Sequence, residues 1–115
     1  DVKKVNEIIN IVGLSEFVSS LPNKLNTIIG ERGASISGGQ IQRIGIARAL
    51  YSDFDILIMD EATNSLDIAN SKLIIECAKN LQKIGKTVIF ISHDLNLLKN
   101  CDLNYKFENK SLIKL

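Results

Sequence analysis

The chain has 115 residues, 45% of them hydrophobic and 23% charged, with a formal net charge of +1, which is typical of one globular domain with a single modest core. The near-neutral charge argues against nucleic acid as a partner. No apolar run approaches the roughly 18 residues that cross a bilayer, so we expect this segment to be soluble by itself.

Residues 1–40 predict two helices and an irregular segment. Apolar residues recur at helical spacing over residues 2–12 and stop at Gly13, which favours a helix with a glycine at its C-terminus. Ser15 is placed to cap a second short helix, and Pro22 ends it. The chain begins without Met and directly in a helical pattern, which indicates a piece of a longer protein.

A third helix is predicted over residues 39–51. It follows an irregular segment, residues 23–37, and opens on a serine and two glycines. We expect its buried side to be formed by Ile41, Ile44, Ala47, Leu50 and the stem of Arg48.

A strand, a helix and a second strand follow. The apolar runs at 55–60 and 87–92 are typical of parallel strands covered on both faces, and the residues between them predict a helix over about 66–84. This βαβ unit makes the fold class α/β, with a helical part joined to half of a mostly parallel sheet. Residues 103–115 alternate around "ENK" and predict a terminal hairpin.

Polar side chains follow both strands at their carboxyl ends, where parallel α/β sheets bind their ligands. Asp60 and Glu61 end the first strand, and His93 follows the second. Because parallel strands place these ends side by side, we expect an acid pair and an imidazole on one rim. Two structural alternatives remain open: the acids could simply end a strand, and His93 could cap the helix that begins near Asp94.

The start of the third helix is a candidate anion site. Ser37, Gly38 and Gly39 would offer a hydroxyl and backbone N–H groups at the positive end of the helix dipole. The alternative is a flexible helix start with no ligand. Asp67 fits the position of a first-turn acid that the dipole of the following helix favours.

Combined, these residues form one chemical pattern. A carboxylate such as Asp60 can hold Mg²⁺ through a water while substrate phosphates complete the coordination shell. Glu61 can then orient and deprotonate a water aligned on a γ-phosphate, and His93 can stabilise the phosphate oxygens. The pattern predicts a nucleoside triphosphate as ligand. Cys77 and Cys101 lack metal-ligand spacing and are expected to be ordinary reduced thiols.

Four motifs, in this order, resemble those of the ATP-binding cassette (ABC) ATPases. "ISGGQ" at 36–40 resembles the family's LSGGQ signature, and "ILIMDE" at 56–61 resembles the Walker B strand with its adjoining glutamate. "NSLD" at 64–67 is similar to the D-loop, and His93 to the switch histidine of the H-loop. Order and spacing agree with the family pattern over nearly the whole chain, and they imply a partial P-loop NTPase fold.

The resemblance also implies roles for single residues in an ATPase. Glu61 would polarise the attacking water, His93 would contact the γ-phosphate, and Asp60 would hold Mg²⁺ through water. Covalent order alone would permit one site within a chain, but the family pairs the motifs in trans, across a dimer. The residues implied to close over the partner's ATP and to couple the two sites are Ser37, Gly38, Gly39, Gln40 and Asp67.

"NTIIGERG", residues 26–33, resembles the segment that faces the transmembrane domain in exporter-type cassettes. The resemblance therefore implies two partners, a second nucleotide-binding domain and a transmembrane domain contacted by the segment that runs from Thr27 to Gly33. The location implied is the cytoplasmic face of a membrane, within a transporter that exports its substrate.

No G-x-x-x-x-G-K-[ST] loop, which cradles the β- and γ-phosphates, occurs among these residues. The resemblance implies the C-terminal portion of one ABC ATPase domain, with residues 1–40 as the helical signature subdomain and 41–115 as the Walker B and H-loop part of the core. We expect little ATPase activity from this segment alone. Two rival functions remain, a soluble cassette protein acting in DNA repair or on the ribosome and a non-catalytic dimerisation fragment.

Overall fold

The N-terminal layer consists of α1 (Val2–Ile11), α2 (Ser15–Ser20) and the 3-10 turn η1 (Lys24–Asn26) in a computed structural model that describes residues 1–115. Gly13 follows α1 with φ 71°, so the predicted glycine end is confirmed. The predicted cap at Ser15 is wrong, because Ser15 is the first residue of α2 and Leu14 occupies the cap position without a side-chain hydrogen bond. Leu14 N donates to Ile9 O at 2.9 Å, so the chain passes directly from the end of α1 into α2.

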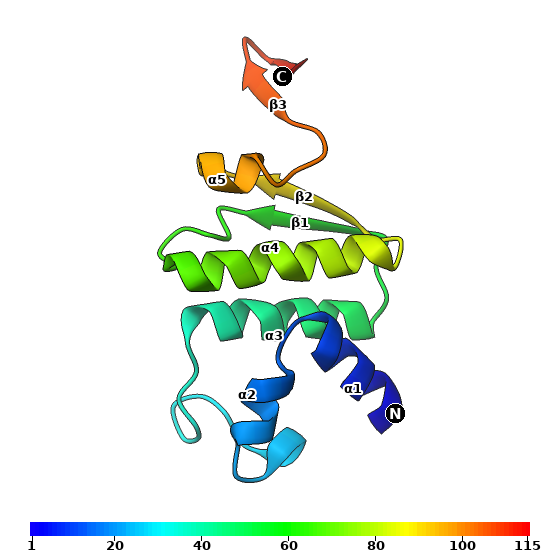
Figure 1. Cartoon of the computed structure of the whole chain (residues 1–115), viewed down its shortest axis with the longest axis vertical. Coiled ribbons are helices and arrows are strands. Elements are labelled where there is room, and N and C mark those ends of the chain that lie inside the picture. The colour runs from blue at the N-terminus through cyan, green and yellow to red at the C-terminus, as the bar shows by residue number, and fades with distance from the viewer.

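The third helix, α3 (Gly38–Tyr51), lies between the N-terminal helices and α4 (Ile68–Lys83), as Figure 1 shows. Its predicted buried side is partly wrong. Ile41 is 54% exposed and Arg48 is also exposed, whereas Arg43 and Ile46 are buried together with Leu50. The face is set by two neighbours, α1 and α4, and not by the apolar residues alone.

Arg43 is the buried charged side chain of α3, and it has carbonyl partners there. Its Nη1 donates to Gly13 O at 2.6 Å and its Nε to Gly39 O at 3.3 Å, so the guanidinium links α3 to the turn after α1. Burial lowers the pKa of Arg43. Burial also raises the pKa of Cys77 to about 11, so this thiol is protonated at neutral pH. Both cysteines of the chain are free.

The strand–helix–strand unit is confirmed. It consists of β1 (Ile56–Asp60), α4 and β2 (Thr87–Ile91), and the two strands are parallel with Ile56 opposite Thr87 and Asp60 opposite Ile91. Both strands therefore end at the same edge, toward the left of Figure 1. α3 runs opposite to β1, so its first turn lies at this same edge.

The sheet differs from prediction in its exposure. The helix α4 covers one face, where Met59 is 8% exposed. On the other face Ile56 and Ile58 are exposed on β1, as are Ile89 and Ile91 on β2, so in this chain the strands are covered on one side only. The apolar run predicted two covered faces because hydropathy records a residue's preference for burial and not the presence of a neighbour.

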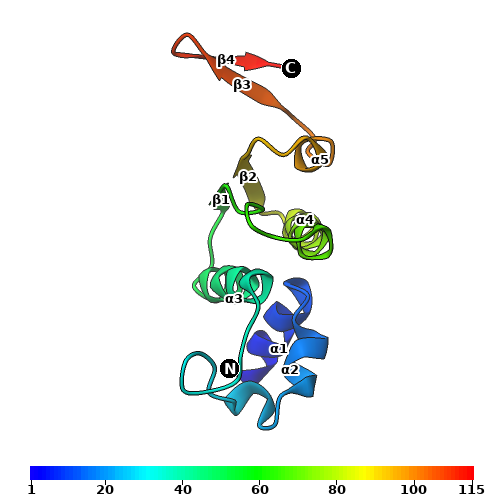
Figure 2. The same ribbon diagram turned by 90° about the vertical axis from the view of Figure 1, so that its left-hand side faces the viewer.

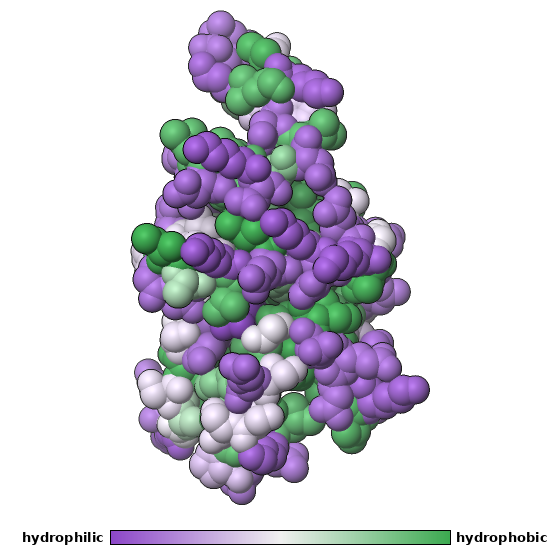
Figure 3. Space-filling view, viewed as in Figure 1, coloured by the Kyte–Doolittle hydropathy of each residue, from purple (hydrophilic) through white to green (hydrophobic).

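The predicted terminal hairpin is confirmed as β3 (Tyr105–Glu108) and β4 (Ser111–Lys114), joined by Asn109 and Lys110 at φ 50° and 63°. Positive φ at both turn residues matches a two-residue hairpin turn. The hairpin follows the short helix α5 (Leu95–Leu98) and stands apart from the β1–β2 sheet, as Figure 2 shows. In Figure 3 hydrophobic residues are visible on its surface, in agreement with the exposed Phe107 and Leu112.

One hydrophobic core joins the layers. It takes residues from α1, α3, β1 and α4 and from the turns beside them, so α3 packs on both the N-terminal helices and the βαβ unit. The proposed division at residue 40 remains a prediction. The buried members of this core are Ile8, Val12, Leu14, Ile46, Leu50, Met59, Ala62, Ile74, Cys77 and Leu81.

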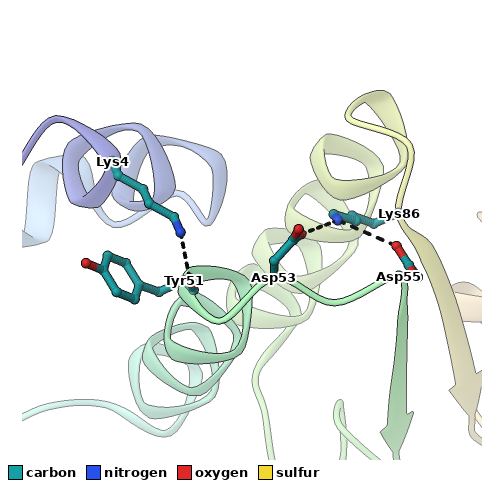
Figure 4. Close-up of polar contacts among 5 residues, drawn as sticks. All are labelled: Lys4, Tyr51, Asp53, Asp55 and Lys86. Carbon is teal, nitrogen blue, oxygen red and sulfur yellow. Dashed lines mark hydrogen bonds and ion pairs between the residues drawn. The ribbon is translucent and has the colours of Figure 1, made fainter. Parts of the chain in front are cut away.

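Polar contacts fix the opposite end of α3, far from the strand ends. Lys4 Nζ of α1 donates to Tyr51 O at 2.8 Å, and Lys86 Nζ, just before β2, lies 2.6 Å from Asp53 Oδ1 and 4.0 Å from Asp55 Oδ1 (Figure 4). The hydrogen bond and the charge of Lys86 lower the pKa of Asp53. These contacts set the path from α3 into β1 and thereby orient the two elements that carry the candidate site.

Candidate functional site

The structure brings Glu61 and His93 together at the edge where both strands end. Glu61 N donates to Ile91 O at 2.8 Å, which continues the ladder of β1 and β2 by one residue. His93 Nε2 lies 3.5 Å from Glu61 Oε1. Asp94 N donates to Ser92 Oγ at 3.0 Å, a hydrogen bond that links the two residues on either side of His93. An acid and an imidazole therefore share one rim, as predicted.

Glu61 has a backbone conformation that is unusual for a non-glycine residue, and one of its two carboxylate oxygens has no hydrogen-bond partner. Its φ is 51°, a left-handed conformation that costs a non-glycine residue on the order of 1 kcal/mol. Its side chain is 31% exposed, and Oε2 is buried without a hydrogen-bond partner. The His93 side chain is 97% exposed. The carboxylate thus has one oxygen toward His93 and one that is buried without a partner.

Asp60 is the last residue of β1 and is exposed. It lies two residues after Ile58 and four after Ile56, so it shares with them the uncovered face of the sheet. No group of three or more His, Cys, Asp or Glu side chains gathers anywhere in the chain. A single strand-end carboxylate fits a hard cation that keeps waters and takes its other oxygens from a substrate.

The first turn of α3 is capped in an ordered way. Ser37 is the N-cap, Gln40 N donates to Ser37 Oγ at 3.2 Å, and Ser37 N donates to Gln40 Oε1 at 2.8 Å, which completes a capping box. The amides of Gly38 and Gly39 have no helical partner, since they belong to the first turn. The helix start is therefore a structured donor of N–H groups at a positive dipole end.

Asp67 and Asp94 both cap helices. Asp67 is the N-cap of α4, and its Oδ1 accepts from Asn70 N at 2.7 Å and from Asn70 Nδ2 at 3.0 Å, so it lies outside the first turn in which it was expected. Asp94 caps α5 by accepting from Asn96 N at 2.8 Å. The interpretation of His93 as that cap is therefore wrong.

Three side chains that touch this region were not singled out from the sequence: Gln42, Arg43 and Asn70. Gln42 Nε2 donates to Ala62 O at 2.5 Å, directly after Glu61. A Cβ added to Gly39 would lie 2.6 Å from Asn70 Oδ1, so this glycine allows a close approach of α3 to α4. Gln42 and Arg43 are polar residues inside a helix that packs on two neighbours. That position in the sequence could have indicated that their side chains have buried polar partners.

The segment 27–33 folds back on itself before α3. Ile29 and Ala34 form an isolated bridge, and Ile28 is 74% exposed. A Cβ on Gly33 would lie 2.0 Å from Ile28 O, so the turn requires glycine there. This tight loop places an apolar side chain at the surface.

Comparison with known proteins gives the class. The chain matches the family described as "ABC transporter" over residues 2–64. It is 50% identical over 99 residues to an ATP-dependent lipid A-core flippase of Pseudoalteromonas translucida, with 86% of this chain covered. It is 44% identical over 115 residues to the alpha-hemolysin translocation ATP-binding protein HlyB of Proteus vulgaris, with 98% covered.

A third relative is the leukotoxin translocation ATP-binding protein LktB of Mannheimia haemolytica, 45% identical over 106 residues, or 90% of this chain. The chain therefore belongs to the ABC transporter family, and its parallel strand pair with flanking helices is a partial ABC ATPase fold. It spans 17%, 16% and 14% of the length of these three relatives. None of its helices is long and apolar enough to span a bilayer.

Proposed function

We propose that these residues are the C-terminal part of the ATP-hydrolysing domain of an exporter. The observation that carries the proposal is the Glu61–His93 contact of 3.5 Å at the carboxyl ends of two parallel strands. The relatives named as a flippase and as toxin translocation proteins support export over a soluble function. The exported substrate would be moved across a membrane at the expense of ATP.

Glu61 would act on the attacking water. Its carboxylate, 31% exposed, would accept a hydrogen bond from a water and then its proton on the side that faces His93, since Oε2 is buried. His93 is exposed enough to reach a phosphate oxygen and would stabilise charge that develops there. Glu61 would thus be the general base, and His93 would stabilise the charge on the phosphate.

Asp60 would hold Mg²⁺ through water, since it is an exposed carboxylate beside the site and no group of three or more His, Cys, Asp or Glu side chains forms a protein cage there. Bound Mg²⁺ supplies charge neutralisation to the phosphates. Asp60 itself needs only to accept hydrogen bonds from water at the strand end.

The first turn of α3 would bind ATP held by a partner domain. The free amides of Gly38 and Gly39 are donors for phosphate oxygens, and the Ser37–Gln40 capping box holds them in place. Asp67, at the start of α4, would couple the two sites. The partners are then a second nucleotide-binding domain and a transmembrane domain, met by the exposed loop 27–33, at the cytoplasmic face of the membrane.

The test compares the full-length protein that contains this segment with residues 1–115 expressed alone. We expect the full-length protein to hydrolyse ATP and the isolated segment to show little or no turnover, because the phosphate-binding loop with its lysine is not among its residues. Steady-state phosphate release measures both. Turnover by the segment that depends on Glu61, or none by the full-length protein, would contradict the proposal.

A further inference from the structure

Gln42 connects α3 to the loop that carries Glu61. Building on the proposed ATPase function, we propose that Gln42 is a positioning residue that makes the first turns of α3 and the Glu61 loop move as one unit. Its Nε2 donates to Ala62 O at 2.5 Å, across 20 residues of sequence. Ala62 follows Glu61 directly, so this bond acts one peptide unit away from the left-handed Glu61 backbone.

The loop between β1 and α4 packs on the core through Ala62 and Leu66 but has few other hydrogen bonds. Within it, Asn64 N donates to Glu61 O at 3.1 Å and Leu66 N to Thr63 O at 3.2 Å, both of them local turns. The bond from Gln42 is the hydrogen bond that ties the loop to α3. Without this hydrogen bond, the Glu61 side chain would be oriented by the local turns of the loop and by the bond of Glu61 N to the end of β2.

The polar head of Gln42 makes no other hydrogen bond. Its Oε1 is buried without a partner, and the chain's other unpartnered buried side-chain atoms belong to Glu61 and Thr63, the two neighbours of Ala62. An apolar side chain of the same shape would avoid the free-energy cost of burying Oε1 without a hydrogen-bond partner. The amide is therefore best explained by the one bond it makes, which fixes geometry.

A second contact joins α3 to the far end of the same loop. Gly39 lies against Asn70, whose backbone and side-chain N–H groups both donate to Asp67 Oδ1. The first two turns of α3 thus hold the loop near both of its ends, at Ala62 and at Asp67. When a nucleotide draws in the first turn of α3, the loop with Glu61 follows, which links one ATP site to the base of the other.

The test uses the full-length protein with Gln42→Met, which keeps the size of the side chain and removes the donor. Gln42→Asn keeps the amide but shortens its reach, so it tests the same hydrogen bond if the first variant does not fold. The matched control is Asn80→Leu: Asn80 Nδ2 of α4 donates to Ile11 O at 3.0 Å, an equivalent bond between elements away from the loop.

We expect both Gln42 variants to lower kcat by about 10- to 100-fold, as for other small misplacements of a reacting group, with KM for ATP within about twofold of the original value. Asn80→Leu should keep kcat within about twofold. Backbone amide exchange in residues 61–66 should become faster in Gln42→Met and stay unchanged in Asn80→Leu.

Unchanged kcat in both Gln42 variants, an equal loss in Asn80→Leu, or unchanged loop exchange in Gln42→Met would each overturn this role for Gln42. None of these results touches the ATPase proposal, which is tested on the unsubstituted full-length protein and on the isolated segment. The two failures are therefore distinguishable within one set of assays.

Discussion

Glu61→Gln in the full-length protein is expected to abolish ATP hydrolysis while leaving ATP bound. The substitution keeps the shape of the side chain but removes the carboxylate that would take a proton from water, a loss of general-base catalysis of about 10²- to 10⁴-fold. Binding should persist, because Asp60, His93 and the first turn of α3 are unchanged. Phosphate release and retention of labelled ATP after gel filtration measure the two effects.

Glu76→Gln is the control for that experiment, since Glu76 is an exposed carboxylate on α4 away from the strand ends. It should hydrolyse ATP at the original rate. If Glu61→Gln also turned over at the original rate, Glu61 would not be the base.

Gly39→Ala should also reduce turnover strongly. A Cβ at this position would lie 2.6 Å from Asn70 Oδ1 and 3.1 Å from Asn70 Cβ, closer than van der Waals contact allows. Because Asn70 is held by two hydrogen bonds to Asp67 Oδ1, it cannot yield without disturbing the start of α4. We expect kcat to fall by about tenfold or more, through displacement of α3 from the loop that carries Glu61.

Gly45→Ala is the matched control on the same helix. Nothing lies within 4 Å of a Cβ at Gly45, and alanine in an exposed helix interior should raise stability by about 0.5–1 kcal/mol. Turnover by this variant should be unchanged. Equal activity of the Gly39 and Gly45 variants would show that the close approach of α3 and α4 has no part in catalysis.

The parts of the fold that the sequence predicted depend on local patterns. The runs at β1 and β2, the helix between them and the hairpin around Asn109 follow from hydropathy and turn chemistry. The Glu61–His93 rim follows from the geometry of parallel strands, since residues after neighbouring strands must meet at one edge.

The remaining details depend on partners distant in sequence. Arg43 is buried and Ile41 exposed because the carbonyls of Gly13 and Gly39 lie on one side of α3, which no periodicity records. Asp67 caps its helix instead of lying inside it, because the helix begins at Ile68, about two residues later than the pattern placed it. The Gln42 contact was missed because its acceptor is a backbone carbonyl, which every residue has.

We propose that the first turn of α3 and Glu61 of one chain contact different ATP molecules. The first turn of α3 and the carboxyl end of β1, which Glu61 follows, lie on the same side of the molecule (Figure 1), so one chain could in principle place both at one ATP. The most direct measurement is a structure of the full-length Glu61→Gln protein with ATP and Mg²⁺. We expect ATP between residues 37–40 of one domain and Asp60, residue 61 and His93 of the other. ATP contacted by both sets from a single chain would contradict this proposal.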